Sequence, residues 1–512
     1  MPILVPDLLY RNGRFEPGLA LEYDAARGTI LRVGPASELI PARPTGVRPG
    51  AGSAGSAGVA AGPETGPDGG PSMPGDAADG VEASGGDVAF PEIERLPGRA
   101  LMPGFVNAHS HAFQRVIRGR TQWRSAAEPR ADFWSWREAM YAAALRLSPE
   151  DVYHVSRQCF LEMLRTGITA VGEFHYLHRD PDGKPYADPN ELALRVIQAA
   201  RDVGVRIALL NVCYATGGIG RPLGEEQRRF ATPSLDGYLA ETGALLAAVR
   251  GDPGVTVGVA PHSIRAVPRP WLAELHRWAA EADVAFHIHV SEQTAEVEAS
   301  VREYGLRPVE LLADAGVVDE RLTAVHATHL TEGEIALLGD GSAVVCACPT
   351  TERDLGDGFL PGAELLAAGA WIALGTDSQT VIDMFDEMRL VEYHERLRRQ
   401  RRVVLAVPGG DGRLEVAPLL LEMATVAGAK SLRLPAGRLE PGALADMVAV
   451  DLEHEALAGW TPDTLGALLT LTAPASVVSE VWVGGQRRLT GRRHPLDEAA
   501  LAEFRRVAVA LA

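Results

Sequence analysis

Residues 100–111 read ALMPGFVNAHSH, an apolar run that ends in two histidines separated by one residue. Further short apolar runs follow along the chain, at 169–174, 206–213, 256–260, 285–290, 323–327, 343–347 and 371–375. Runs that are apolar throughout are typical of parallel strands buried on both faces. Helical patterns lie between them; in residues 148–165, Ser148 is a candidate N-cap and Gly167 follows the end. Eight such strands alternating with helices predict an α/β protein with a (β/α)8 TIM-like barrel.

The alternative to a closed barrel is a doubly wound open sheet. No glycine-rich phosphate loop follows an early strand, which disfavours that fold. Both ends of the chain show β character, with turn signals at residues 11–13, 26–28, 441–442 and 484–485. We therefore expect the two ends to pair into one small β-sandwich accessory domain.

These patterns divide the chain into three segments. Residues 1–98 form the first part of the accessory domain, residues 99–432 the barrel, and residues 433–512 the rest of the accessory domain. Residues 46–86 consist mostly of Gly, Ala, Pro and Ser, a composition with too few large apolar side chains to offset the entropy of ordering. We predict a disordered insertion there, without a function of its own.

The 512 residues carry 49 Lys+Arg against 67 Asp+Glu, a formal net charge of −18. An acidic chain is a poor binder of nucleic acids and of anionic membrane surfaces. The chain starts without a signal peptide and contains no apolar run of the length that a membrane helix needs, so a soluble cytoplasmic protein is expected. Net charge acts at long range, however, and does not exclude an acidic substrate whose pocket carries local positive charge.

The four cysteines, Cys159, Cys213, Cys346 and Cys348, are too few for a disulfide framework. The Cys-Ala-Cys spacing at 346–348 could mark a metal pair, but no second cysteine pair completes a tetrathiolate site. We expect both side chains to be small buried apolar groups on a strand.

Histidines fall where the predicted barrel would carry its active site. His109 and His111 end the first strand, and His289 ends the fifth. His326 ends the sixth strand, and Asp377 follows the eighth. Residues i and i+2 of a strand point to the same face, and (β/α)8 barrels carry their sites at the carboxyl ends of the strands. Imidazoles and a carboxylate at one rim indicate a site for a divalent metal, with zinc expected and iron(II) as the alternative.

These residues also carry a resemblance. The segment MPGFVNAHSH at 102–111, with His289-x-x-Glu292, His326 and Asp377, resembles the amidohydrolase superfamily. Within it, the chain is similar to the formimidoylglutamate deiminases of histidine degradation through HSHAFQR at 109–115, FWSWR at 133–137, EFHY at 173–176, APHSIRAV at 260–267, VHATH at 325–329 and LGDG at 355–358. The His-x-His motif identifies only the superfamily, whereas the Phe-Trp-x-Trp-Arg and His-Ser-x-Arg segments are more discriminating. The resemblance covers the chain apart from 46–86.

The resemblance implies a ligand set. Superfamily members with two metals bridge them through a carboxylated lysine, but between residues 100 and 375 the only lysine is Lys184, in a turn signal. We therefore expect one metal per subunit, with one coordination position open to water. The expected ligands are His109, His111, His289 and Asp377.

The resemblance also implies roles for the neighbouring residues. Glu292 would act as general acid and base for the attacking water, and Asp377 would orient that water. His326 would hydrogen-bond the attacking oxygen; His329 is a competing candidate for this role. The structural alternative for Glu292 is a carboxylate at a helix N-terminus, where the helix dipole favours it.

The implied substrate is N-formimino-L-glutamate, a small dianion that would be hydrolysed to N-formyl-L-glutamate and ammonia. Arginine suits carboxylate recognition because its guanidinium group binds both oxygens at once. Arg137 and Arg265 are the candidates for this contact, although surface salt bridges are the alternative for any arginine in a chain so rich in them. Gln114, Tyr176 and His262 are the candidate neutral hydrogen-bonding partners.

Two other interpretations are considered. Another amidohydrolase acting on a cyclic substrate, such as a guanine or cytosine deaminase or an imidazolonepropionase, would need a pocket for a neutral ring. A scaffold protein that has lost catalysis would be expected to lack part of the metal set. A homodimer is an expectation from the resemblance alone.

Overall fold

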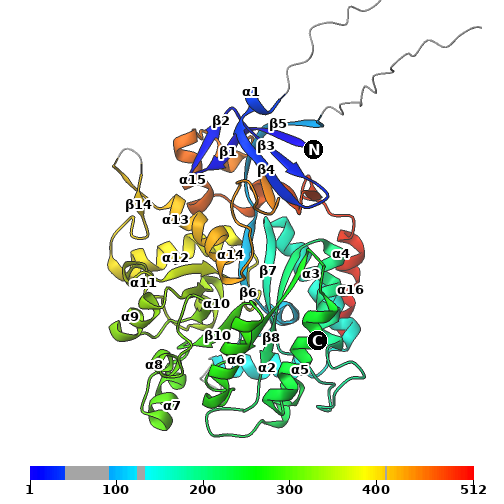
Figure 1. Ribbon diagram of the computed structural model, residues 1–512, viewed down its shortest axis with the longest axis vertical. Helices are drawn as coiled ribbons and strands as arrows, with labels where there is room; N and C mark the ends of the chain where they lie inside the picture. Colours follow the sequence, from blue (N-terminus) through cyan, green and yellow to red (C-terminus); the bar gives the residue numbers. More distant parts are fainter. Residues whose placement is uncertain (41–90, 124–132, 410–411, 512) are drawn as a thin grey trace, which may run out of the picture.

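Eight parallel strands of the computed structural model pair in chain order (Figure 1). The structure describes residues 1–40, 91–123, 133–409 and 412–511, so the predicted insertion at 46–86 lies outside the described residues. The strands are β6 (Phe105–Ser110), β7 (Ile168–His175), β8 (Arg206–Cys213), β9 (Val255–Pro261), β10 (Phe286–Val290), β11 (Leu322–His326), β12 (Val344–Ala347) and β13 (Trp371–Leu374). Nearly all of their residues are buried, as strands covered on both faces must be. The prediction of a (β/α)8 barrel is confirmed.

The barrel closes between its first and last strands. Asp377 donates its backbone N–H to the carbonyl of His109 (3.0 Å) and accepts from the backbone N–H of His111 (3.0 Å). Gly375 permits this approach, because a Cβ atom at this position would lie 2.8 Å from Cβ of His109 and 2.9 Å from its carbonyl oxygen. The closure therefore requires glycine directly after β13.

Helices surround the barrel. They are α2 (Phe133–Ala144), α3 (Pro149–Arg165), α4 (Glu191–Val203), α5 (Leu235–Ala248), α6 (Arg269–Glu281), α7 (Thr294–Tyr304), α8 (Pro308–Asp314), α9 (Glu332–Asp340), α10 (Pro349–Leu355), α11 (Gly362–Ala368), α12 (Met384–Arg399), α13 (Ala417–Glu422), α14 (Gly428–Ser431) and, at the C-terminus, α16 (Asp497–Ala510). The helix predicted at 148–165 is α3. Ser148 caps it by accepting the backbone N–H of Asp151 (3.1 Å), and the Asp151 carboxylate accepts the backbone N–H of Ser148 (3.1 Å). No helix of the described residues is both long and apolar enough to cross a bilayer.

A second sheet combines strands from both ends of the chain, above the barrel in Figure 1. It runs in the order β18-β17-β16-β5-β1-β3-β4, with β2 paired to β1. Its strands are β1 (Ile3–Arg11), β2 (Arg14–Pro17), β3 (Leu19–Asp24), β4 (Thr29–Pro35), β5 (Ile93–Pro103), β16 (Met447–Asp451), β17 (Val478–Val483) and β18 (Gln486–Thr490). Strand β5 joins the two ends, because it pairs in parallel with β1 and antiparallel with β16. Strands from both ends of the chain thus build one accessory unit, as expected, but they form a single sheet, whereas the predicted β-sandwich needs two sheets packed face to face. Helix α15 (Pro462–Leu471) contacts β2.

The apolar run at 100–108, predicted as one strand, is divided at Gly104. Strand β5 ends at Pro103 in the accessory sheet, and β6 begins at Phe105 in the barrel. A Cβ atom at Gly104 would lie 2.2 Å from the Thr169 hydroxyl on β7, so glycine is required where the chain passes from one sheet to the other. Continuous hydrophobicity cannot reveal this passage. The domain limits at 98/99 and 432/433 stay predictions; β5 extends across the first of them.

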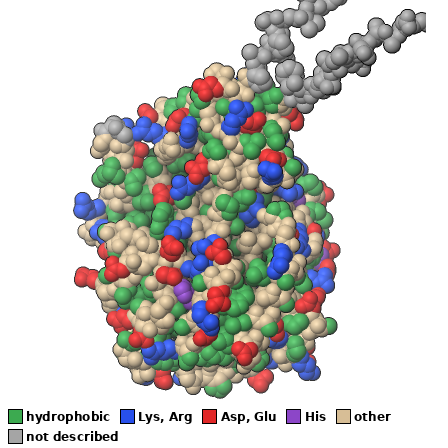
Figure 2. All heavy atoms as spheres, viewed as in Figure 1, with side chains coloured by type: hydrophobic (Ala, Val, Ile, Leu, Met, Phe, Trp, Pro, Cys, Tyr) green, Lys and Arg blue, Asp and Glu red, His purple; other side chains and the backbone are tan. Residues whose placement is uncertain are grey.

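On the face of the molecule shown in Figure 2, Lys and Arg side chains are interspersed with Asp and Glu. This distribution is unlike the single basic face that phosphate backbones require.

A buried ion pair joins the barrel to the accessory sheet. Arg206, at the start of β8, donates Nε to Oδ2 of Asp446 (2.9 Å) and Nη2 to Oδ1 (3.1 Å), and both residues are almost fully buried. Asp446 also accepts the backbone N–H of Gly484 in the β17–β18 turn (2.6 Å). One carboxylate thus fixes the contact between the two sheets.

Replacing Arg206 by Met should lower the free energy of unfolding by about 3–5 kcal/mol, because it leaves Asp446 buried without its counter-charge. The matched control is Arg201→Met, which breaks the more exposed pair between Arg201 Nε and Asp252 Oδ2 (2.8 Å) and should cost less than about 1 kcal/mol. Urea unfolding of both variants measures the difference. Equal losses would contradict the assigned role of the buried pair.

Candidate metal centre and active site

Four buried side chains from three regions of the barrel meet at the carboxyl ends of the strands. His109, His111, His289 and Asp377 each offer one ligand atom, and these atoms all lie within 4.8 Å of one another. Nε2 of His109 lies 3.2 Å from Nε2 of His111 and 3.1 Å from Nε2 of His289. Oδ1 of Asp377 lies 3.3 Å from the first of these nitrogens and 3.2 Å from the second. Lone pairs this close repel one another unless a cation lies among them, so the group fits a metal ion.

Backbone carbonyls fix the direction of two of these imidazoles. Nδ1 of His111 lies 2.9 Å from the carbonyl oxygen of Phe174, and Nδ1 of His289 lies 2.9 Å from that of His262. A carbonyl oxygen can only accept, so each Nδ1 carries the hydrogen and each neutral ring keeps a lone pair on Nε2. Metal-binding histidines are commonly oriented in this way.

Burial keeps the imidazoles of His109 and His289 neutral. It lowers the pKa of His109 to about 3 and the pKa of His289 well below its ordinary value. Burial alone would raise the pKa of Asp377, but the imidazoles of His109 and His111 outweigh it and hold that pKa well below its usual range. Neutral imidazoles and an ionised carboxylate are the protonation states that a metal requires.

The backbone around the centre holds several residues in the left-handed region. Ser291 (φ 53°), His326 (φ 71°), Ala327 (φ 51°) and Asp377 (φ 44°) all have positive φ. Such conformations cost about 1–3 kcal/mol each and are retained where the surrounding structure or function demands them. Here they direct side chains at the strand ends toward one point.

Glu173, on β7, supports the segment between the two histidines of the first strand. Its carboxylate accepts the hydroxyl of Ser110 (2.6 Å) and the backbone N–H of Ala112 (2.7 Å). Gln379 also donates to the Ser110 hydroxyl (2.8 Å). The segment that carries His109 and His111 is therefore bonded to β7 on one side and to the loop after β13 on the other.

Glu292 and His326 lie beside the metal group. Oε1 of Glu292 is 3.8 Å from Nε2 of His326, and this nitrogen is 3.9 Å from Oδ2 of Asp377. On its other side, Nδ1 of His326 lies 3.3 Å from Oε1 of Glu352 on α10. His329 is half-buried and does not line the pocket.

Arg265 lies between two carboxylates. Its Nη2 donates to Oε2 of Glu292 (3.1 Å), and its Nε lies 3.8 Å from Oε2 of Glu296 on α7. Burial alone would lower the pKa of Arg265, but Glu296 and Glu292 outweigh it and raise that pKa. Nη1 of Arg265 is buried without a hydrogen-bond partner, so a donor remains for another group in the pocket.

The other predicted substrate contacts line the same pocket. Gln114 donates to the hydroxyl of Tyr176 (2.7 Å), and its own Oε1 is buried without a partner. The imidazole of His262 packs edge-on against Tyr176 (5.8 Å between centroids). Arg137, on α2, and Arg265 both lie over the Phe133 ring, at 6.0 and 5.6 Å from its centroid. All predicted site residues are thus brought to one region.

Several residues of the site carried no clear signal in the sequence. Tyr214 directly follows β8, so the strand-end argument used for the histidines could have found it. Glu296 lies in the first turn of α7, where the helix dipole favours a carboxylate, so its sequence context indicates no further role. Nothing in the sequence marked Glu352.

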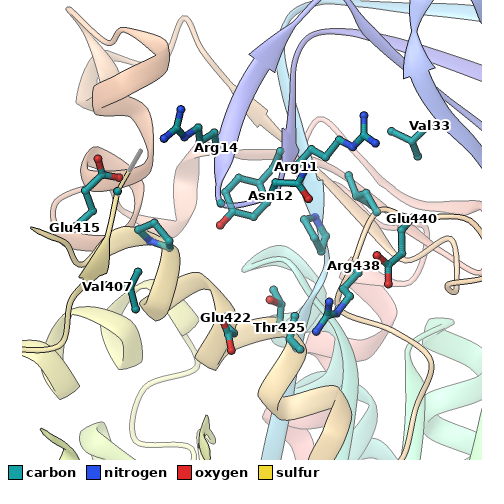
Figure 3. Close-up of a pocket in the computed structure, with 18 of the residues that line it drawn as sticks. Arg11, Asn12, Arg14, Val33, Val407, Glu415, Glu422, Thr425, Arg438 and Glu440 are labelled. Carbon is teal, nitrogen blue, oxygen red and sulfur yellow. The ribbon is translucent and has the colours of Figure 1, made fainter. Parts of the chain in front are cut away.

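A second hollow, of about 640 Å³, lies away from the strand ends (Figure 3). Arg11, Arg14 and Arg438 line it together with Glu415, Glu422 and Glu440. It is larger than the hollow at the metal group, which measures about 50 Å³. It nevertheless contains none of the histidines or carboxylates described above. The candidate active site is therefore identified by the reactive side chains that meet there, and not by the size of the hollow.

Both lysines lie away from the candidate metal centre. Lys184 is exposed, and the Lys430 ammonium lies 5.6 Å from the Trp371 ring centroid. Trp371 is at the start of β13, the opposite end of the strand from Asp377. Neither lysine is placed to carry a bridging carbamate.

Comparisons with known proteins agree with this geometry. The sequence model of the amidohydrolase family matches residues 100–488. A formimidoylglutamate deiminase of Pseudomonas aeruginosa is 38% identical over 429 residues, which are 83% of this chain and 93% of the relative. A 5-methylthioadenosine/S-adenosylhomocysteine deaminase of Natronomonas pharaonis is 30% identical over 76% of this chain and 81% of its own length. The crystal structure of an amidohydrolase from Brucella melitensis superimposes with a TM-score of 0.81 at 31% identity, covering all of both chains.

Removing the metal should destabilise the protein, because the converging ligands are then left without a cation. A metal present at about 1,000 times its dissociation constant contributes about 4 kcal/mol. We expect dialysis against a chelator to lower the unfolding temperature and one equivalent of metal to restore it. His111→Ala should abolish the response, whereas His276→Ala, in a pair with Asp319 outside the site, should keep it. An unchanged unfolding temperature after verified metal removal would contradict the assignment.

Proposed function

This chain belongs to the amidohydrolase family, and we propose that it hydrolyses N-formimino-L-glutamate to N-formyl-L-glutamate and ammonia. The observation that carries the proposal is the convergence, in one pocket, of a buried metal-ligand group, the carboxylate of Glu292 and two arginines. The substrate needs all three: water activation, a proton carrier for the departing nitrogen, and positive charge for its two carboxylates.

A metal would be held by His109, His111, His289 and Asp377. When bound, a divalent metal supplies a Lewis acid that lowers the pKa of a coordinated water toward about 7. Three imidazoles and one carboxylate favour zinc, with iron(II) as the alternative.

Glu292 moves the proton. Its Oε2 is held by Arg265, so Oε1 is the oxygen left to accept a proton from the attacking water. Ammonia takes up both protons of the water: the carboxyl group passes the first to the =NH nitrogen during attack, and the second, taken from the new hydroxyl, as that nitrogen leaves, which balances the reaction. Asp377, whose backbone hydrogen bonds close the barrel, orients the water.

His326 stabilises the negative charge that develops during attack. Burial by itself would lower the pKa of His326, but Glu292, Glu352 and Asp377 outweigh it and raise that pKa well above its ordinary value. With Nδ1 held by Glu352, a protonated ring directs Nε2–H toward the reacting atoms. A donor fixed in a buried site is effective because it needs no reorganisation.

Arg137 and Arg265 bind the carboxylates of the substrate. Gln114 offers a free acceptor for an N–H of the amidine, and Tyr176 and His262 complete the wall. The hollow of about 50 Å³ is smaller than a substrate of this size, so side chains must move aside on binding. We assign this movement to the half-buried residues Trp136 and Arg137 of α2.

The rival substrates are cyclic, as in a guanine or cytosine deaminase or an imidazolonepropionase. A neutral ring has no carboxylate to accept from the buried Nη1 of Arg265, which would stay without a hydrogen-bond partner, and this disfavours a cyclic substrate. A non-catalytic scaffold would have no need to preserve Glu292 beside a full ligand set. The homodimer and the cytoplasmic location stay predictions.

The decisive assay compares ammonia release from N-formimino-L-glutamate and from guanine, with purified metal-loaded protein. We expect turnover of the first compound only. In Glu292→Gln, kcat should fall by about 100- to 10,000-fold, the range of general acid–base catalysis, with metal content unchanged. Turnover of the ring compound alone would refute the substrate, and an unchanged kcat in the variant would refute the proton carrier.

Glu296→Gln should separate kcat from KM. The change removes one of the two carboxylates that neutralise Arg265. The guanidinium group is then freer to attract the dianion, so KM should fall, while it holds Glu292 more firmly, so kcat should also fall. Each effect should be about fivefold, as expected for about 1 kcal/mol. Glu298→Gln, exposed on the same helix, should change neither constant, and a raised KM in Glu296→Gln would contradict the charge argument.

A further inference from the structure

A second group of metal-ligating side chains adjoins the first. His326, Cys348 and Asp377 each offer a ligand atom, and the three atoms lie within 4.8 Å of one another. All three residues are buried; Cys348 is fully buried and His326 is 1% exposed. The group comes from three different strand ends, those of β11, β12 and β13. Nothing in the proposed reaction uses the thiol.

Asp377 faces both groups. Its Oδ1 lies among the first group, 3.3 Å from Nε2 of His109 and 3.2 Å from Nε2 of His111. Its Oδ2 points to the other side, 3.9 Å from Nε2 of His326. A carboxylate with its two oxygens directed to two ligand groups can bridge two metal ions.

Glu352 orients the other two ligands. Its Oε1 accepts the backbone N–H of Cys348 (2.8 Å) and lies 3.3 Å from Nδ1 of His326. The hydrogen bond to Nδ1 directs Nε2 of this imidazole away from Glu352 and toward Asp377. A carboxylate behind a ligating histidine is the usual outer support of a metal site.

The chemistry of the group selects the ion. One sulfur, one nitrogen and one oxygen favour a borderline or soft divalent ion, zinc or cadmium, over magnesium or calcium. Binding requires the Cys348 thiolate and a free lone pair on Nε2 of His326, so the thiol proton and the proton on this nitrogen both pass to solvent. His326 and Asp377 line the pocket, so an ion can enter by the route of the substrate.

We propose that His326, Cys348 and Asp377 form a second, weaker metal site, which zinc or cadmium fills when in excess over the catalytic metal. Occupancy inhibits the enzyme, because it takes His326 away from the reacting atoms and draws Asp377 away from the attacking water. The inhibition rests on the proposed function, whereas the binding does not.

The test titrates cadmium into protein already loaded with one equivalent of metal. The first group contains no sulfur, so a cadmium–thiolate charge-transfer absorption in the ultraviolet reports only on the second site. We expect this absorption to appear together with a second equivalent of bound metal by equilibrium dialysis, and ammonia release to decline in parallel.

Cys348→Ala should abolish the absorption and raise the inhibitory cadmium concentration at least about 10-fold, with activity at one equivalent of metal unchanged. Cys348→Ser serves as a second variant if the alanine variant does not fold. Cys159→Ala, at a fully buried free cysteine on α3 that belongs to neither ligand group, is the matched control and should behave like the parent.

A stoichiometry that stays at one, or an absorption that persists in Cys348→Ala, would overturn the proposal. If N-formimino-L-glutamate proves not to be the substrate, the dialysis and the absorption still decide whether the site exists. The failure of the proposed function and the failure of this site are therefore distinguishable.

Discussion

The backbone hydrogen bonds that close the barrel between its first and last strands bring the candidate metal ligands together. The backbone of Asp377 pairs with His109 and His111, so the last strand delivers its carboxylate to the two imidazoles of the first. Gly375 makes the approach sterically possible. Without the closure, the metal ligands would lie on opposite edges of an open sheet. The fold thus places the ligands, and the metal is expected to stabilise the fold in return.

A series of neighbouring ionisable side chains extends from Asp377, at the barrel closure, into the pocket. Asp377 is adjacent to His326, which is adjacent to Glu292, and Glu292 is paired with Arg265. Glu296, fully buried behind Arg265, shares its charge. In the proposed reaction, the guanidinium group would therefore serve two functions: it would hold Glu292, the proposed proton carrier, and attract a carboxylate of the substrate. A substrate carboxylate bound to Arg265 would compete with Glu292 for this group, which would couple recognition to catalysis.

Much of the barrel was predictable from the sequence, because buried parallel strands are apolar throughout and helices carry capping signals such as Ser148. The convergence of the strand-end histidines His109 and His111 was also predictable, because residues i and i+2 of a strand point to the same face. The passage at Gly104 was not, because hydrophobicity does not change where a chain leaves one sheet for another. The role of Glu296 was hidden because its partner Arg265 lies on a different element.

By itself, the sequence determined the barrel class, the accessory sheet built from both ends, and the residues that could ligate a metal. These features follow from local periodicity and from residue type, both of which can be read from the sequence alone. Only the tertiary structure decided which atoms meet: that Arg265 is shared by two carboxylates, and that Cys348, expected to be an inert buried group, lies beside His326 and Asp377. Distances of 3–4 Å between residues far apart in the chain depend on how the strands close into a barrel, and no local sequence pattern predicts them.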